Sequence, residues 1–497
     1  MYIGMEEWNM RTRKVAAMTA VAAALVIAPF ALAQQGAPDD YRQRAEALEK
    51  RMEQLERNQR ELLGATEEQI QKATERLAKE KEQGSDILVS WKDSLQFATR
   101  DGSVKTTIGG RLDIDHAWNY ASGDVRNYTI PMTGSKIGAN DDGTEVRRIR
   151  FHMAGTVRDS TFFKLELDFS GQDNAVQSNV PKGGSGTAQP LKGSTVVLKD
   201  AYIGMKDLLP FATVQVGHFK EPFSLEELTS DNFITFMERG LPNAFVPGYN
   251  MGLMLYDAPF GERVTWSVGI FQDTDDRGYL QANNAWDFTG RVTGLPWYEN
   301  NGEQLLHVGV GGSHRAPANT YQYTARPENH LAKSFLNTGA MQTGAVDLMN
   351  AEAALVYGPL SMQGEIIRSQ VGRNGKSTAD FNGGYVYASY FLTGEHRNYK
   401  TSSGYFDRVK PAANFGVHKG GERGWGAWEI AARYSWLDLD DHDIQGGKMA
   451  DWTLGLNWYL NPNMRIQANY VLADLSGNGP SKGGPANMFG IRFHVDF

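Results

Sequence analysis

The sequence predicts an all-β fold: a 16-stranded antiparallel transmembrane β-barrel, preceded by an N-terminal signal peptide and a periplasmic α-helical coiled-coil segment. Three observations predict this fold. Residues Met488 to Phe497 alternate apolar and polar side chains and finish on an aromatic residue. Fifteen earlier segments alternate in the same way. Between them, short turns alternate with long polar loops, as in barrels whose turns lie on one side and loops on the other. A soluble all-β protein is the alternative fold.

The composition agrees with a barrel and excludes several other classes. The chain has 497 residues, of which 41% are hydrophobic and 22% charged, with a formal net charge of -8. This is too polar for a helical membrane protein but suits strands that present every second side chain to lipid. Cysteine is absent, which excludes a disulfide scaffold and thiolate metal sites. We see no basic stripe and expect no nucleic-acid partner.

Residues 1–33 have the features of a secretory signal peptide, and residues 1–9 are expected to be an upstream extension of it. Arg11, Arg13 and Lys14 precede an apolar run over residues 15–30, and Ala31-Leu32-Ala33 forms a small-residue cleavage signal. An uncleaved membrane anchor is the alternative, but the apolar run is short for a membrane span. We therefore expect the chain to be exported.

Residues 34–84 are expected to form a helical coiled-coil segment. Apolar side chains recur at alternating spacings of four and three, as at Ala45, Leu48, Met52 and Leu55. Such a stripe is buried when helices associate, which predicts an oligomerising stalk in the periplasm. A single solvated helix or a spacer is the alternative. Residues 85–104 are read as a linker, and residues 105–497 as the barrel.

Sixteen alternating segments make up the predicted barrel, an even number as bacterial barrels require. They span residues 105–118, 146–157, 161–169, 194–205, 211–219, 250–257, 264–271, 285–295, 304–312, 350–357, 360–369, 384–394, 425–436, 450–461, 463–473 and 487–497. One connection breaks the parity of turns and loops. Residues 395–424 should form a short periplasmic turn, yet the segment is long and rich in Lys, Arg and Gly.

Alternation also assigns side chains to the two faces of each strand. In 425–436, Trp428 and Ile430 are expected to face lipid, while Glu429 and Arg433 face the lumen. The basic residues at lumen phases, which we expect to line the pore and contact anions, are Arg111, Arg148, Arg150, Lys164, Arg291, Arg433 and Arg465, with Arg492 at the same phase. Arg147, also expected to line the pore, falls on the other face of its strand or at the pore mouth. Carboxylates share the lumen face at Asp113, Asp115, Glu166, Asp168, Glu429 and Asp496, so ion pairing within the barrel is the competing role for these arginines.

The segment at 217–239 reads GHFKEPFSLEELTSDNFITFMER, and others read GEHRNY (394–399), GYFDRVKP (404–411), GAWEIAARYSWLDLDD (426–441) and WTLGLNWYLNP (452–462). This series resembles the phosphate-selective porin O and P family over residues 100–497. The resemblance implies a homotrimeric 16-stranded porin whose third extracellular loop narrows the lumen. It also implies a pore lined by arginines and lysines, which we carry over only to Arg147, Arg148 and Arg150. The residues expected in the constriction loop are Lys220, Glu221, Glu226, Glu227, Asp231 and Arg239.

We therefore expect an outer-membrane porin for passive diffusion of small anions such as phosphate or polyphosphate. A general or weakly cation-favouring porin is the alternative, because the constriction segment, with Glu238, has five acidic and two basic side chains. A structural or adhesive barrel is a further alternative. Enzyme activity is not expected, since no Ser/His set is spaced for catalysis. No cofactor or metal is expected either: the acidic cluster at residues 438–443 lacks EF-hand spacing, although divalent ions at this loop could bridge lipopolysaccharide.

Overall fold

The computed structural model describes most of residues 87–497, with gaps at 93, 171–195, 280–284, 318–319, 418–422 and 478–481, and parts of residues 46–75. The chain divides into two units, Met1–Ser85 and Asp86–Phe497. In the first unit the described residues are helical. The signal peptide lies outside the described residues, and association of the helical segment stays a prediction. No helix within the described residues is long and apolar enough to cross a membrane.

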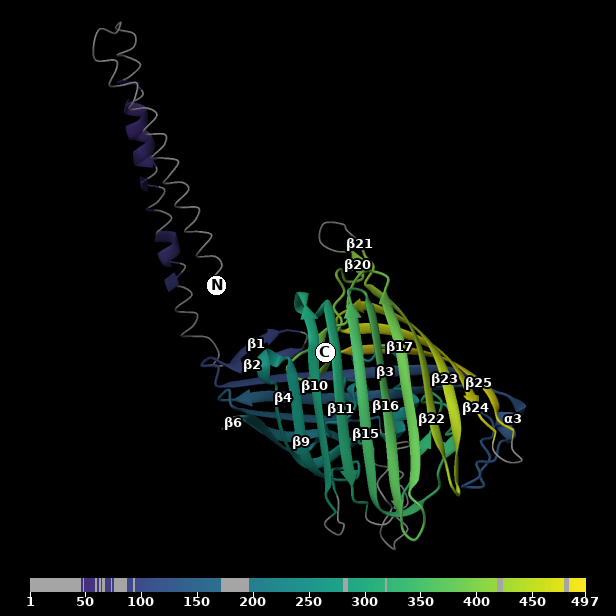
Figure 1. Ribbon diagram of the computed structural model, residues 1–497. Helices are drawn as coiled ribbons and strands as arrows, with labels where there is room; N and C mark the ends of the chain where they lie inside the picture. Colours follow the sequence, from purple (N-terminus) through teal and green to yellow (C-terminus); the bar gives the residue numbers. More distant parts are fainter. Residues whose placement is uncertain are drawn as a thin grey trace. The chain divides into compact units, whose positions relative to one another are not determined.

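The second unit is a closed antiparallel barrel (Figure 1). Each of its sixteen strands pairs with the next along the chain, and the last pairs with the first, from Ala486 opposite Ala121 to Asp496 opposite Arg111. All sixteen predicted strands are therefore confirmed. The strands are β3 (Val104–Ala121), β4 (Gly143–Val157), β5 (Thr161–Asp168), β6 (Val197–Leu209), β7 (Ala212–Lys220), β8 (Tyr249–Asp257), β9 (Val264–Gln272), β10 (Asp287–Glu299), β11 (Gln304–Arg315), β15 (Met341–Tyr357), β16 (Leu360–Arg373), β17 (Ala379–Phe391), β22 (Ala427–Asp441), β23 (Ile444–Asn461), β24 (Met464–Leu475) and β25 (Gly484–Asp496).

A hairpin precedes the barrel where the sequence suggested only a linker. It consists of β1 (Ile87–Trp91) and β2 (Leu95–Thr99). β2 pairs with the first residues of β3, where Leu95 lies opposite Ile108 and Ala98 opposite Lys105. β25 pairs with the later part of β3, so the hairpin and the closing strand occupy different stretches of the same edge.

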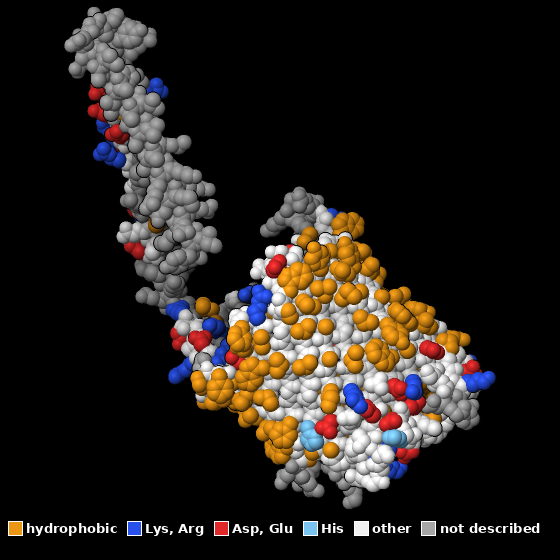
Figure 2. Space-filling view, in the orientation of Figure 1, with side chains coloured by type: hydrophobic (Ala, Val, Ile, Leu, Met, Phe, Trp, Pro, Cys, Tyr) orange, Lys and Arg blue, Asp and Glu red, His pale blue; other side chains and the backbone are white. Residues whose placement is uncertain are grey.

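The outer wall of the barrel is apolar. Val292, Val310, Met349, Ile366 and Val386 lie on five consecutive strands and are 49–60% exposed. Figure 2 shows hydrophobic side chains spread over this wall, with most charged side chains at its margins. Apolar side chains are stable in such numbers on a surface only where lipid covers them, so this belt marks the bilayer.

Two connections fold inward rather than away from the barrel, and a third does so in part, since its β20 and β21 stand beyond the strand ends (Figure 1). The inner loop, which we define as residues 221–248, joins β7 to β8 and contains α4 (Leu225–Leu228) and η2 (Leu241–Phe245). Residues 316–340 contain β12 (Thr320–Tyr321), β13 (Thr324–Ala325) and β14 (Leu336–Asn337). Residues 392–426 contain β18 (Tyr399–Lys400), β19 (Tyr405–Phe406), β20 (Gly416–Val417) and β21 (Arg423–Gly424). The remaining described helical turns are α3 (Gly123–Asn127), α5 (Pro259–Glu262) and η3 (Asn300–Gly302).

Two of these connections, residues 221–248 and 316–340, contribute to a substantial apolar cluster inside the barrel at its loop-bearing end. Phe245 of the inner loop contacts Tyr323, with ring centroids 4.9 Å apart, and Tyr323 contacts Phe381 of β17 at 6.0 Å. Val125 and Phe335 are fully buried in the same cluster. Part of the lumen is therefore filled by loop side chains, and the charged residues described next lie beside this filled region.

Candidate pore constriction

A β-bulge in β4 turns two successive arginines into the lumen. The register of β4 against β3 shifts between Asp113 and Ile114, because Arg148 lies opposite Asp113 and Val146 opposite Ile114. Arg147 is the extra residue. Both Arg147 and Arg148 are buried, as is Arg150, whereas Ile149 between them faces outward. A bulge commonly redirects a side chain in this way. The three arginines carried over from the family motif thus all face inward.

Asp231 of the inner loop lies among four guanidinium groups. Its carboxylate is 3.3 Å from Arg111 of β3, 3.4 Å from Arg148 and 3.2 Å from Arg150 of β4, and 2.5 Å from Arg239 of its own loop. The four cations come from two strands and from the loop itself. These contacts fix the middle of the inner loop against the β3–β4 wall.

The other acidic side chains of the inner loop are paired as well. Glu238 contacts Arg147 at 3.1 Å and Arg492 of β25 at 2.7 Å. Glu227 contacts Lys220 at 2.8 Å and Arg239 at 3.1 Å. The remaining two carboxylates are those of Glu221, which contacts Arg315 at 3.1 Å, and Glu226, which contacts Arg433 at 3.1 Å. The acidic excess of the loop is therefore offset by cations rather than presented to open solvent.

Two cavities meet at this loop. One has a volume of about 310 Å³ and is lined by Arg147, Arg148, Arg326 and other residues near the loop-bearing end. The other has a volume of about 610 Å³ and extends past Arg111 and Lys164 toward the opposite end. Four residues line both cavities: Arg150, Lys220, Asp231 and Tyr249. These four side chains lie where the two cavities adjoin, a place that we call the junction.

The other predicted lumen residues also lie inside the barrel and pair with other groups than Asp231. Lys164 contacts Glu166 at 2.8 Å and Asp200 at 2.6 Å. Arg291 contacts Glu352 at 2.6 Å, and Arg433 contacts Glu328 at 2.5 Å in addition to Glu226. Arg465 donates to the backbone carbonyl of Ile234 at 2.9 Å. Their anion-contacting role stays a prediction.

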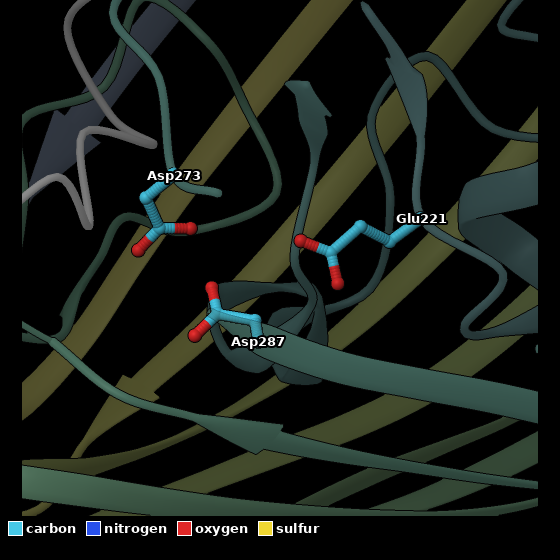
Figure 3. A group of neighbouring side chains, drawn as sticks. All are labelled: Glu221, Asp273 and Asp287. Carbon is cyan, nitrogen blue, oxygen red and sulfur yellow. The ribbon is translucent and has the colours of Figure 1, made fainter. Parts of the chain in front are cut away.

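One group of charges was missed by the sequence reading. Glu221, Asp273 and Asp287 converge so that their oxygens lie within 4.8 Å of one another (Figure 3). The guanidinium of Arg315 contacts all three, at 3.1 Å from Glu221 and 2.8 Å from Asp287. Arg315 therefore supplies positive charge to these carboxylates. Arg315 lies at an inward phase of β11, but the predicted strand ended at residue 312 and left it out.

The acidic cluster at 438–443 forms a tight turn between β22 and β23 rather than a long loop. Asp438 contacts Lys448 at 2.7 Å, and Asp443 contacts Lys376 at 2.6 Å and Arg373 at 2.5 Å. Hydrogen bonds from Lys376 and Arg373 lower the pKa of Asp443. These carboxylates are already bound to basic side chains.

Comparison with known proteins identifies the family. The model for phosphate-selective porin O and P matches residues 123–497. Porin O of Pseudomonas aeruginosa is 25% identical over 427 residues, covering 78% of this chain and 87% of that protein. An uncharacterised protein of Caulobacter vibrioides is 29% identical over 429 residues, covering 82% of this chain and 77% of its own length. The anion-selective porin from Comamonas acidovorans has a TM-score of 0.45 at 14% identity, covering 79% of this chain and all of that one.

The closed barrel, its apolar outer belt and its charged interior agree with the family match. They identify an outer-membrane channel in a bacterial cell, and the chain belongs to the phosphate-selective porin O and P family.

Proposed function

We propose that this channel carries small anions, such as phosphate or polyphosphate, across the outer membrane by passive diffusion. The observation that carries the proposal is the convergence of Arg111, Arg148, Arg150 and Arg239 at the junction of the two cavities. Lys220 lines the same junction. Any solute crossing the junction therefore passes several cationic side chains.

Arginine suits this role for physical reasons. The guanidinium is ionised at every physiological pH and presents donors in a fork that matches phosphate and carboxylate oxygens. Conduction also requires an ion to leave, and several moderate contacts meet this need better than one deep site. The cations are distributed in this way, since Arg147 lies on the first cavity and Lys164 on the second.

A general or weakly cation-favouring porin is the second candidate. The specific observation in its favour is that each arginine at the junction also contacts a carboxylate, so the local net charge is far smaller than the number of arginines suggests. Net lining charge, rather than arginine content, sets the sign of ion selectivity.

Planar bilayers containing the purified full-length protein distinguish the two candidates. Under a potassium chloride gradient, the reversal potential gives the ratio of chloride to potassium permeability. We expect this ratio to exceed one, and we expect added phosphate to block the chloride current in a concentration-dependent manner. A ratio below one without phosphate block would favour the second candidate.

We also propose that the protein is a homotrimer whose N-terminal helical segment lies in the periplasm, with lipopolysaccharide around the barrel. The apolar stripe of residues 34–84 supports self-association. Cross-linking of the full chain in outer-membrane vesicles should give a trimer band, and deletion of residues 34–84 should weaken it.

A further inference from the structure

The two cavities differ in the side chains that line them. Among the aromatic residues that line the larger cavity are four that we call the aromatic wall: Phe162 of β5, Tyr202 of β6, Phe219 of β7 and Tyr256 of β8. They lie one on each of four consecutive strands. Among the described residues, the aromatic lining of the smaller cavity consists of Tyr249 and Tyr321. Aromatic surface is therefore concentrated in the larger cavity, on the side of the junction away from the loop-bearing end.

Contacts between the rings hold the aromatic wall in place. The ring centroids of Phe162 and Tyr202 are 6.2 Å apart, and those of Tyr202 and Phe219 are 5.9 Å apart, both edge to face. The Phe162 ring also lies against the backbone of β6, since a Cβ at Gly204 would be only 2.0 Å from it. Gly204 is buried under this ring, whereas Phe162 and Tyr202 themselves are half-buried. The wall therefore keeps fixed ring positions and leaves ring surface facing the cavity.

The size and lining of the larger cavity suit an organic solute better than an inorganic ion. Its volume of about 610 Å³ lies in the range of sites for small organic ligands, which combine aromatic lining with a few polar groups. Ring surface in contact with water gains stability when another apolar surface covers it, and two rings in contact gain further from their geometry. Inorganic phosphate has no apolar surface, so the aromatic wall offers it nothing.

Lys164 lies beside the aromatic wall. It follows Phe162 by two residues on the same face of β5, and it pairs across the sheet with Tyr202. Two residues along a strand span about 7 Å, so a solute that contacts the Lys164 ammonium can also reach the rings. The Lys164 side chain is 27% exposed, against 7% for Arg150.

The contacts of Lys164 leave room for a solute oxygen. An ammonium group has three donors. Two carboxylates contact that of Lys164, Glu166 at 2.8 Å and Asp200 at 2.6 Å. A third donor is therefore available to an oxygen in the cavity, next to the exposed ring surface.

We propose that the larger cavity is a binding subsite for phosphate monoesters of aromatic alcohols, with the ring of the solute against Phe162 and Tyr202 and its phosphate group at Lys164. This inference rests on the proposed passage of anions and adds a class of organic solute to it. The cations at the junction act on inorganic phosphate and on a monoester alike. Contact with the aromatic wall is what distinguishes the two solutes.

The test compares two esters that differ only in the organic group. Phenyl phosphate and methyl phosphate carry the same charged group, but only the first has a ring. Each is added to planar bilayers that contain the purified full-length protein, and block of the chloride current is measured. In the wild-type channel, phenyl phosphate should half-block the current at a concentration about fivefold lower than methyl phosphate, because its ring contacts the aromatic wall.

Paired variants locate the ring contact. Phe162→Leu combined with Tyr202→Leu should bring the two half-blocking concentrations to about the same value, with block by methyl phosphate unchanged. Phe162→Tyr combined with Tyr202→Phe keeps both rings and should preserve the difference. Phe493→Leu combined with Tyr390→Leu is the matched control, since these rings are 55% and 45% exposed on the outer wall, and it should also preserve the difference.

Each outcome decides the inference. A preference for phenyl phosphate that is lost only in the leucine pair supports the subsite. Equal block by the two esters in the wild-type channel, a comparison that needs no variant, would overturn the inference but leave the proposed function standing if inorganic phosphate blocks. A preference that survives in the leucine pair would also overturn it, since the ring would then bind elsewhere. A channel that inorganic phosphate and both esters fail to block would contradict the proposed function together with this inference.

Discussion

Arg433 shows how a charged side chain is held inside this barrel. Its guanidinium is fully buried, contacts Glu226 and Glu328, and donates to the backbone carbonyl of Glu238 at 2.9 Å. It also lies over the ring of Phe236, 4.3 Å from the centroid. One side chain of β22 thus joins the wall to two inward connections. Removing one charged side chain from such a site destabilises the fold, because its partner is then a buried charge without compensation.

We predict that Arg433→Gln destabilises the barrel by about 3–5 kcal/mol, because Glu226 and Glu328 lose their common partner. Guanidinium chloride unfolding in detergent micelles, followed by tryptophan fluorescence, measures this. Arg368→Gln is the control: that arginine is 52% exposed beside Asp380, and exposed pairs contribute at most about 1 kcal/mol. Equal effects of the two variants would contradict the role of Arg433.

The two arginines of β4 that face the junction carry a prediction about selectivity. Arg148→Gln combined with Arg150→Gln removes two positive charges while Asp113 and Asp168 remain. The reversal potential should therefore move toward cations, with the chloride-to-potassium permeability ratio falling by roughly several-fold. Arg368→Gln, outside the lumen, should leave the ratio unchanged. If the double variant also leaves it unchanged, these arginines do not set selectivity.

For single residues, the sequence predicted which face of a strand a side chain lies on, but not which side chains it contacts. Alternation placed Arg148 and Arg150 in the lumen, as the structure does. It left Arg147 undecided, because the bulge that turns Arg147 inward depends on how β4 pairs with β3. The carboxylate partners of Arg147, Arg148 and Arg150 are Glu238, Asp113 and Asp168, which lie 91, 35 and 18 residues away along the chain, so no local pattern contained them.

Among the elements, β7 shows how strand geometry positions the inner loop. Gly217 has φ +137°, and a Cβ at this position would lie 2.2 Å from the Ala201 carbonyl oxygen and 2.6 Å from the Tyr202 Cα. Only glycine fits both the conformation and the close approach of β6. Three residues later, Lys220 ends β7 and contacts Glu227 of the inner loop.

We predict that Gly217→Ala costs on the order of 1–3 kcal/mol, through backbone strain and displacement of β6. Chemical unfolding would measure the loss, and proteolysis within residues 221–248 would report a loosened inner loop. Gly294→Ala is the matched control, since its nearest neighbouring atom would be 4.0 Å from the new Cβ. A Gly217→Ala protein as stable as the control would contradict this explanation.

The strands were predictable and the inward connections were not, for a physical reason. A strand at the lipid boundary must alternate, because each apolar side chain faces lipid and each neighbour faces the lumen. A connection is shaped by tertiary contacts instead. Residues 395–424 broke the expected parity because the first part of this connection folds into the barrel, where Arg397 lies over Phe406 at 3.6 Å and Arg408 contacts Asp496.

The sequence does contain an indication of the apolar cluster inside the barrel, namely apolar side chains at positions that face the lumen. Leu437 and Leu439 lie at lumen phases near the end of β22, and both are fully buried. Val346 and Leu348 are likewise buried at lumen-facing positions of β15. Apolar side chains at inward phases indicate that a loop covers them, because water would otherwise meet both faces of the strand.

For the whole molecule, closure of the barrel is the feature on which every other conclusion depends. Phe497 donates to the carbonyl of Gly110 at 3.0 Å, and Gly110 donates back at 2.8 Å, so the chain's last residue completes the ring of strands. Closure removes exposed sheet edges within the bilayer and encloses the two cavities. We expect these cavities to form a continuous aqueous path past Arg150, Lys220, Asp231 and Tyr249.

Single-channel recording of the purified protein tests this claim most directly. We predict discrete conductance steps that scale with salt concentration, a reversal potential on the anion side, and reduction of the chloride current by phosphate. A protein that inserts into the bilayer, resists denaturation as a folded barrel, and yet gives no conductance steps would contradict the existence of the path.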